Sequence, residues 1–245
     1  MAARSVLSTC DTEARAKQWR GRHRFLLGAK RAIDMTAAPI LLALFSPLLL
    51  CIAIAIAMDS RGGILFLQPR LGRHGDIFLI FKFRTMFQDA ASLGARFSTY
   101  DGDPRITRVG KFLRRTHLDE LPQFLNVIRG DMSFIGPRPA LPFQYDYYND
   151  REIMRIFCRP GISGWAQIHG NAIDWDEKLR LDAWYVENIS LRLEMKIALL
   201  TVKDIALKWR GGRSTYAGNS DPTWTRGYPA NPLTNSRAEA RRQSV

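Results

Sequence analysis

The feature that most constrains this sequence is the uncharged run at residues 35–58, which lies between Asp34 and Asp59 and consists mostly of Leu, Ile, Ala and Val. A helix that enters a membrane needs ~20 predominantly apolar residues. A secretory signal fits less well, because its apolar core is only ~7–15 residues long and lies near the N-terminus. Here a long basic leader comes first. The sequence therefore predicts a membrane helix over residues 25–58 that stays in the mature protein.

Basic residues on both sides leave the topology of this helix open. Lys30 and Arg31 precede the run, and Arg61 follows it. The positive-inside rule places both flanks in the cytoplasm. A break at Ser46 and Pro47 satisfies the rule, because proline removes a backbone donor and clashes with the preceding turn, so that the helix can leave by the face it entered. The alternative is a spanning helix that Pro47 merely kinks, which membrane helices tolerate.

The composition indicates a globular protein in polyanionic surroundings. With 245 residues, of which 46% are hydrophobic, the chain can bury a sizeable core. Its net charge of +13 and pI of about 10.2 favour nucleic acid, anionic lipid or phosphorylated substrates as partners, and charge alone does not choose among them. The three cysteines are far apart in sequence, which indicates neither a disulfide framework nor a zinc site and favours a reducing compartment.

The two ends of the chain differ in composition from the part between them. Residues 1–24 contain six basic residues and few large apolar ones, which predicts a flexible basic arm. Residues 210–245 are rich in Gly, Ser, Asn, Pro and Arg, which predicts a disordered tail. A single folded domain is expected over residues 59–209.

Within that domain the pattern predicts an α+β fold that is mostly helical. Residues 64–68 and 76–83 are β-prone runs joined by a glycine-bearing turn, which is typical of a β-hairpin. From Phe112 onward the pattern is mostly helical, with breaks where proline and glycine cluster at 136–139 and 159–161.

Residues 174–209 predict two more helices. In the last one, an apolar stripe at helical spacing is interspersed with lysines: Leu193, Ile197, Leu200 and Asp204, with Lys196, Lys203 and Lys208. This pattern indicates a basic amphipathic helix on a lipid surface, and an ordinary surface helix explains the spacing equally well.

Two adjacent carboxylates, Asp119 and Glu120, follow a basic segment that contains Arg114. The structural explanation is a helix cap, since Thr116 and Asp119 have the spacing of a capping box. The functional explanation is that Asp119 attacks phosphorus as a carboxylate nucleophile, while Glu120 points elsewhere on the helix and has another role. A carboxylate that approaches a diphosphate needs a divalent cation such as Mg²⁺, which binds through one or two carboxylates plus substrate phosphates.

Two arginines lie in segments stiffened by proline. Arg138 lies between Pro137 and Pro139, and Arg159 precedes Pro160. Each can present a guanidinium to a phosphate, or each segment can be a rigid turn with no ligand. The sequence contains no Walker A loop, dinucleotide-binding glycine motif, zinc spacing or nucleophile elbow.

Read together, these motifs resemble the small monotopic phosphoglycosyl transferases, the bacterial sugar transferase family that includes undecaprenyl-phosphate galactose and glucose phosphotransferases. The resemblance is colinear from about residue 30 to 207. It is carried by the segments at 30–34, 46–47, 81–86, 103–110, 118–123, 130–139, 159–165 and 185–190.

This resemblance implies a re-entrant membrane helix broken at Ser46 and Pro47, a compact catalytic domain over residues 59–209 on the cytoplasmic face of the bacterial inner membrane, and surface amphipathic helices. It implies Asp119 as nucleophile and metal ligand, with Glu120 as its dyad partner. It also implies phosphate contacts for Arg114, Arg138 and Arg159, lipid head-group contacts for Lys30 and Arg31, and Mg²⁺ at the diphosphate.

The reaction implied is transfer of a sugar 1-phosphate from a UDP-sugar to polyprenyl phosphate with release of UMP, at the first membrane step of exopolysaccharide or other glycan biosynthesis. Glucose or galactose is the expected sugar, with an N-acetylated sugar as the alternative. The rival interpretations are a basic nucleic-acid-binding protein and an inactive membrane scaffold. The first lacks a nucleic-acid-binding motif, so no nucleic-acid partner is expected, and the second leaves the Asp119 segment unexplained.

Overall fold

The computed structural model describes residues 10–88, 103–170 and 175–209. Within them the fold is mostly helical with two small sheets, as expected from the sequence. The predicted tail at 210–245 lies outside the described residues. The helices are α1 Cys10–Arg22, α2 Arg24–Asp59, α3 Arg108–Thr116, α4 Phe124–Arg129, α5 Trp165–Ile168, α6 Trp175–Glu187 and α7 Leu191–Trp209; the strands are β1 Leu65–Leu71, β2 Ile77–Phe83, β3 Ser133–Ile135 and β4 Gly161–Ser163; the 3-10 helices are η1 Arg73–Gly75, η3 Leu118–Gln123, η4 Pro142–Tyr147 and η5 Glu152–Ile156.

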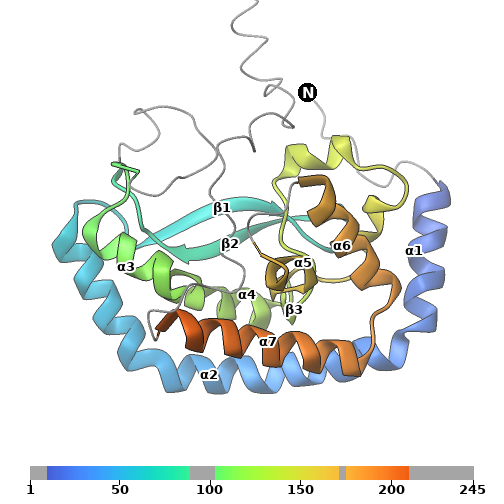
Figure 1. Cartoon of the computed structure of the whole chain (residues 1–245), viewed down its shortest axis with the longest axis horizontal. Coiled ribbons are helices and arrows are strands. Elements are labelled where there is room, and N and C mark those ends of the chain that lie inside the picture. The colour runs from blue at the N-terminus through green and yellow to red at the C-terminus, as the bar shows by residue number, and fades with distance from the viewer. Residues whose placement is uncertain (1–9, 89–102, 171–174, 210–245) are drawn as a thin grey trace, which may run out of the picture.

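The apolar run forms one long helix, α2, which lies along the base of the molecule and bends upward toward β1 (Figure 1). It is the one helix of the described chain that is long and apolar enough to cross a membrane. The helix continues through the expected break, because Pro47 lies inside it and the Ser46 hydroxyl donates to the Ala43 carbonyl at 2.7 Å. The predicted helix is thus confirmed, with a bend in the ribbon and no interruption of the helix.

Both halves of α2 pack against the same domain. In the first half, buried Asp34 accepts hydrogen bonds from the Ser133 hydroxyl and the Phe134 amide. In the second half, Ile52 and Ile56 are buried in a cluster with Phe83 and Leu113. Both halves of the apolar helix therefore contact the rest of the fold.

The predicted hairpin is confirmed: β1 and β2 are antiparallel, in a register that pairs Leu65 with Phe83 and Leu71 with Ile77. The second sheet joins the short strands β3 and β4 in parallel. These strands approach so closely that a Cβ atom at Gly136 would lie 2.4 Å from the Arg159 carbonyl oxygen, and one at Gly161 would lie 2.1 Å from the Gly136 nitrogen. Only glycine permits this approach.

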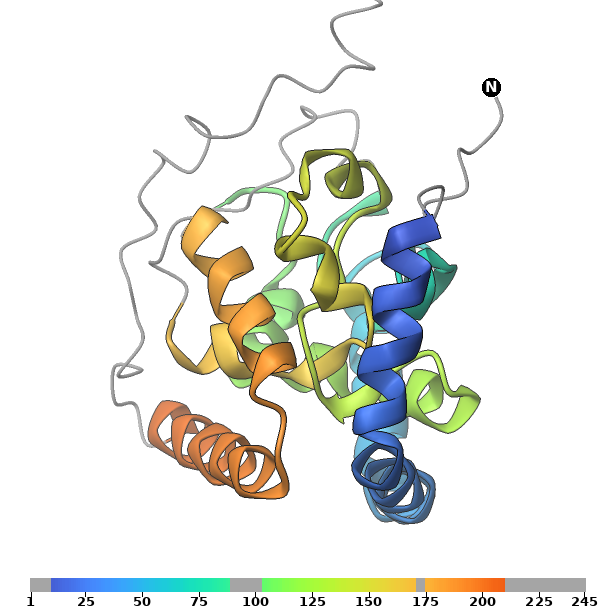
Figure 2. The same cartoon turned by 90° about the vertical axis from the view of Figure 1, so that its right-hand side faces the viewer.

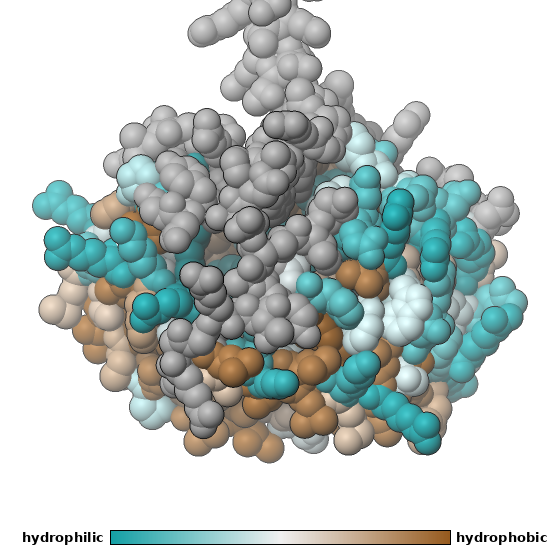
Figure 3. Space-filling model, viewed as in Figure 1, coloured by the Kyte–Doolittle hydropathy of each residue, from teal (hydrophilic) through white to brown (hydrophobic). Residues whose placement is uncertain are grey.

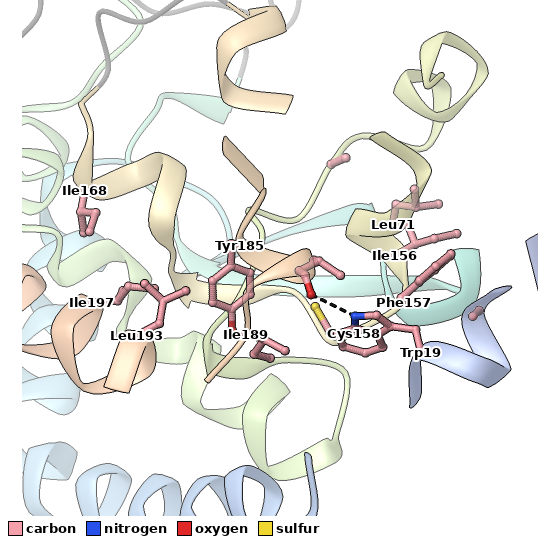
Figure 4. Close-up of a cluster of buried hydrophobic side chains, with 13 residues drawn as sticks. Trp19, Leu71, Ile156, Phe157, Cys158, Ile168, Tyr185, Ile189, Leu193 and Ile197 are labelled. Atoms are coloured by element: carbon pink, nitrogen blue, oxygen red, sulfur yellow. Dashed lines mark hydrogen bonds between the residues drawn. The ribbon is translucent and has the colours of Figure 1, made fainter. Parts of the chain in front are cut away.

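Of the flexible arm expected over residues 1–24, residues 1–9 lie outside the described residues, and Cys10–Arg22 form the helix α1, which stands upright against the domain (Figures 1 and 2). Trp19 is buried, and its indole N–H donates to the Val186 carbonyl at 2.9 Å. Figure 4 shows this side chain in one cluster with Phe157 and Tyr185. Trp19 contributes most of the apolar contact of this basic helix, because burial of a tryptophan removes a large apolar area from water, and Ala16 is buried in the same cluster.

The last helix, α7, lies at the base of the molecule, as α2 does, and Figure 2 shows the two helices apart from each other. Apolar residues gather on this part of the surface (Figures 1 and 3). Leu193 and Ile197, from the stripe singled out in the sequence, are buried against the domain. A second stripe faces outward and consists of Leu191, Met195, Leu199 and Val202. The helix is therefore apolar on two faces, and the stripe available to lipid is not the one that the sequence pattern indicated.

Candidate active site

The acidic pair lies on η3, directly after a sharp reversal of the chain. Thr107 caps the start of α3 by accepting from the Gly110 amide at 2.9 Å, and His117 ends α3 with a left-handed backbone, φ 58°. Thr116 does not cap the next helix, because its hydroxyl donates back to the Phe112 carbonyl at 2.8 Å. The capping-box explanation of the acidic pair is therefore wrong, and Asp119 is left available for another role.

Glu120 is held by two cations. Its Oε1 atom lies 2.6 Å from Lys82 Nζ and 3.7 Å from Arg138 Nη2. Burial alone would raise the pKa of this carboxyl, but the charges of Lys82 and Arg138 outweigh burial and lower it to about 2. Glu120 is thus a permanent anion that anchors Lys82 and Arg138 beside Asp119.

Asp119 has the opposite electrostatics. Burial is the main cause that raises the pKa of its carboxyl, and the neighbouring Glu120 charge adds to it. Lys82 and Arg114 lower the pKa, and the net result is a value of about 6. Within the described ranges no side chain donates a hydrogen bond to this carboxylate. Two adjacent carboxyls with pKa values pushed apart by their surroundings are the usual mark of an acid pair with divided roles.

Lys82 is a site residue that was not predicted from the sequence, although it lies in the segment 81–86 that carries the family resemblance. It is the lone charge in the otherwise apolar strand Ile77–Phe83, and 17% of its side chain is exposed. A charge in such a strand must find a partner. That rule was the available signal, and Glu120 is the partner.

Of the three arginines expected at phosphates, two lie near the dyad. Arg114 donates from Nε to the Thr85 hydroxyl at 2.8 Å, and its charge acts on Asp119. Arg138 is half exposed beside Glu120, with 54% of its side chain accessible. Both guanidinium groups are therefore available to an anion at the dyad.

Arg159 lies at the other end of α4 from the dyad. Its Nε atom donates to the Gly130 carbonyl at 2.7 Å, and Arg31 donates to the Val127 carbonyl at 2.7 Å and the Ile128 carbonyl at 3.1 Å. These carbonyls end α4, where a helix dipole favours cations. In the structure both residues cap a helix, so they are not brought together with Asp119.

Lys30 was expected at lipid head groups, and the structure gives it protein partners. Its ammonium lies 2.5 Å from both Glu194 Oε2 and the Ile135 carbonyl, and only 11% of the side chain is exposed. The contact links the first part of α2 to α7.

The described residues contain no group of three or more His, Cys, Asp or Glu side chains that could hold a metal ion. Asp119 nevertheless fits Mg²⁺, because no side chain of the described residues donates to its carboxylate and Mg²⁺ commonly binds one or two carboxylates together with substrate phosphates. A cavity of about 570 Å³ lies elsewhere, between η4 and α6, and Phe143, Tyr147 and Trp175 are among its lining residues. The dyad does not line it.

Comparison with known proteins places this arrangement in a family. The model of the family "Bacterial sugar transferase" matches residues 25–208. UDP-N-acetylgalactosamine-undecaprenyl-phosphate N-acetylgalactosaminephosphotransferase of Aeromonas hydrophila is 48% identical over 184 residues, which are 72% of this chain and 43% of that protein. UDP-glucose:undecaprenyl-phosphate glucose-1-phosphate transferase of Caulobacter vibrioides is 42% identical, with 72% of this chain and 69% of the relative covered.

Exopolysaccharide production protein ExoY of Rhizobium meliloti is 36% identical over 194 residues, which are 73% of this chain and 86% of that protein. The chain thus spans less than half of the Aeromonas relative and most of ExoY. The matched residues 25–208 include the apolar helix, the hairpin and the acidic pair alike. This chain belongs to the bacterial sugar transferase family.

Proposed function

We propose that the protein transfers a sugar 1-phosphate from a UDP-sugar to undecaprenyl phosphate and releases UMP, through a covalent intermediate on Asp119. The observation that carries the proposal is the divided acid pair. Glu120 is neutralised by Lys82 and Arg138, while the adjacent Asp119 carboxylate accepts no hydrogen bond from a side chain of the described residues and is under the influence of the Lys82 and Arg114 charges. Family membership favours this enzyme over a nucleic-acid-binding protein or an inactive scaffold.

The reaction proceeds in two displacements at one phosphorus atom. An Asp119 carboxylate oxygen attacks the β-phosphorus of the UDP-sugar; the bond from that phosphorus to the bridging oxygen breaks, and UMP leaves with the electron pair. A phosphate oxygen of undecaprenyl phosphate then attacks the same phosphorus. The bond to Asp119 breaks, which regenerates the carboxylate and yields the undecaprenyl diphosphate sugar. Covalent catalysis of this kind divides a difficult transfer into two easier ones.

The surrounding cations make the attack of one anion on another possible. Arg138 and Arg114 supply guanidinium groups to the diphosphate, and Lys82 keeps Glu120 from repelling it. Bound Mg²⁺ would be held by Asp119 and the substrate phosphates, where it would neutralise charge on the diphosphate. Arg31, Arg159 and Lys30 support the scaffold through their protein contacts.

The packing of α2 supports the re-entrant topology. A straight helix of 36 residues would be ~54 Å long, whereas both halves of α2 contact the same domain and the helix bends (Figure 1). A helix that enters and leaves by one face of the membrane meets both conditions. With the positive-inside rule, this face is the cytoplasmic one of the bacterial inner membrane.

The test is UMP release from a panel of UDP-sugars, with Mg²⁺ and undecaprenyl phosphate, by the detergent-solubilised protein. The panel includes the glucose, galactose and N-acetylated donors, because the relatives' names print both UDP-glucose and UDP-N-acetylgalactosamine. We expect release, and a phosphosugar adduct on the intact protein, from the wild type and from the control Asp146→Asn, whose side chain is exposed. Asp119→Asn should give neither. Folded wild type that releases no UMP from any donor refutes the proposal.

A further inference from the structure

A buried ion pair behind the Arg138 segment has no part in the steps above. Arg155 Nη2 lies 2.6 Å from Asp182 Oδ2, and the two side chains are 5% and 2% exposed. Arg155 Nη1 also donates to the Tyr148 hydroxyl at 2.8 Å. A buried guanidinium requires a counter-ion, so Asp182 on α6 fixes Arg155 in one place.

The pair contacts the active site through the backbone. The same Arg155 Nη2 atom donates to the Arg138 carbonyl at 2.9 Å. Pro137 and Pro139 stiffen the chain on both sides of Arg138. Because the backbone has little freedom of its own, its anchor determines where the Arg138 guanidinium lies relative to Glu120, which it approaches at 3.7 Å.

Every backbone carbonyl of the Arg138 segment accepts a hydrogen bond. Each acceptor from residue 137 to 140 has a donor from another part of the fold: Gly161 N to Pro137 O at 2.9 Å, Arg155 Nη2 to Arg138 O at 2.9 Å, Arg70 Nη1 to Pro139 O at 3.1 Å and Leu71 N to Ala140 O at 2.8 Å. The hydrogen bond to the Arg138 carbonyl comes from Arg155, which belongs to the buried ion pair with Asp182.

We infer that Arg155 and Asp182 are positioning residues, which hold the Arg138 backbone so that its guanidinium meets the diphosphate at the dyad. This inference rests on the proposed transferase function. Neither residue touches substrate. Tyr148 also contacts the Arg155 guanidinium, whose central carbon lies 5.2 Å from the centre of the Tyr148 ring.

A double-mutant cycle tests the inference. Asp182→Asn keeps the shape of the side chain and removes the charge that fixes Arg155. We expect it to lower kcat/KM for the UDP-sugar about tenfold to a hundredfold, the size of one lost hydrogen bond to a charged group. In an Arg138→Ala background the same change should cost less than about twofold, because nothing remains to be positioned. Equal factors in both backgrounds overturn the inference, since a merely structural residue acts independently of Arg138.

The matched control is Glu187→Gln, which breaks the exposed ion pair between Arg151 and α6 at 2.8 Å and leaves the Arg138 carbonyl untouched. Its kcat/KM should equal that of the wild type. If Asp182→Asn does not fold, Tyr148→Phe removes a single hydrogen bond to Arg155 and enters the same cycle, with a smaller effect that Arg138→Ala again abolishes; an unchanged or additive effect counts against the inference.

Hydrogen exchange separates failure of this inference from failure of the transferase proposal, because it needs no substrate. Peptides that contain residues 136–140 should exchange faster in Asp182→Asn than in the wild type, while peptides of β1 and β2 exchange alike. Unchanged exchange at 136–140 overturns the positioning role whatever the enzyme transfers. Absence of UMP release by the wild type refutes only the reaction.

Discussion

Replacement of Lys82 by methionine should destabilise the protein strongly at neutral pH. The pKa of Glu120 lies at about 2 in the folded chain, against an ordinary 4.5, and each unit corresponds to about 1.4 kcal/mol. With 16% of the Glu120 side chain exposed, the depression represents about 3 kcal/mol of stability at pH 7. Lys82 is the foremost of the groups that lower this pKa. This loss of stability agrees with the ~3–5 kcal/mol lost when one partner of a buried pair is removed.

Thermal unfolding in detergent measures the effect. For a domain of this size about 1 kcal/mol shifts Tm by roughly 2–4 °C, so Lys82→Met should lose about 6–12 °C at pH 7. A folded-state pKa below the ordinary value stabilises above pH about 4.5 and ceases to do so as pH falls toward about 2, so the gap to the wild type should narrow in that range. Lys111→Met, at an exposed lysine, should leave Tm unchanged. A Tm of Lys82→Met within about 2 °C of the wild type at pH 7 would refute the reasoning.

Two further outcomes follow from the same geometry. The first half-reaction needs ionised Asp119, whose pKa is raised to about 6, so single-turnover UMP release should rise with pH with its midpoint at about pH 6. Glu120→Gln removes a neighbouring negative charge and should move that midpoint lower. A midpoint that does not move contradicts the assigned cause. Gly136→Ala places a Cβ atom 2.4 Å from the Arg159 carbonyl oxygen and should cost about 1–3 kcal/mol, seen as a lower Tm, whereas Gly28→Ala meets no atom within 4 Å and serves as the control.

Elements with a strong local signal were predictable from the sequence. The helix expected over residues 25–58 corresponds to α2, Arg24–Asp59, and the two β-prone runs around a glycine turn form the hairpin. The two helices expected over 174–209 are α6 and α7. In these segments periodicity, turn chemistry and length all favour the same structure.

What could not be predicted depends on contacts between distant segments. Helix α1 has a basic composition, and it packs on the domain through Trp19, which donates a hydrogen bond to the carbonyl of the distant residue Val186. Strands β3 and β4 are three residues each, too short for a period, and their glycines looked like punctuation. Likewise the sequence identified Asp119 and Glu120 but not the charges that divide their roles, because Lys82 reaches Glu120 only through the fold.

The packing of α2 has a practical consequence for anyone who wishes to obtain the catalytic part in aqueous solution. The long apolar helix also covers part of the interior: Ala38 and Ile56 are 0% and 2% exposed, and Asp34 accepts hydrogen bonds from the Ser133 hydroxyl and the Phe134 amide. A truncated form that starts after Asp59 would keep the acidic pair yet lose the surface on which its supporting elements rest. Detergents or lipid discs are therefore part of any workable preparation, and solubility is better sought by redesign of the outward-facing side chains of α2 and α7 than by deletion.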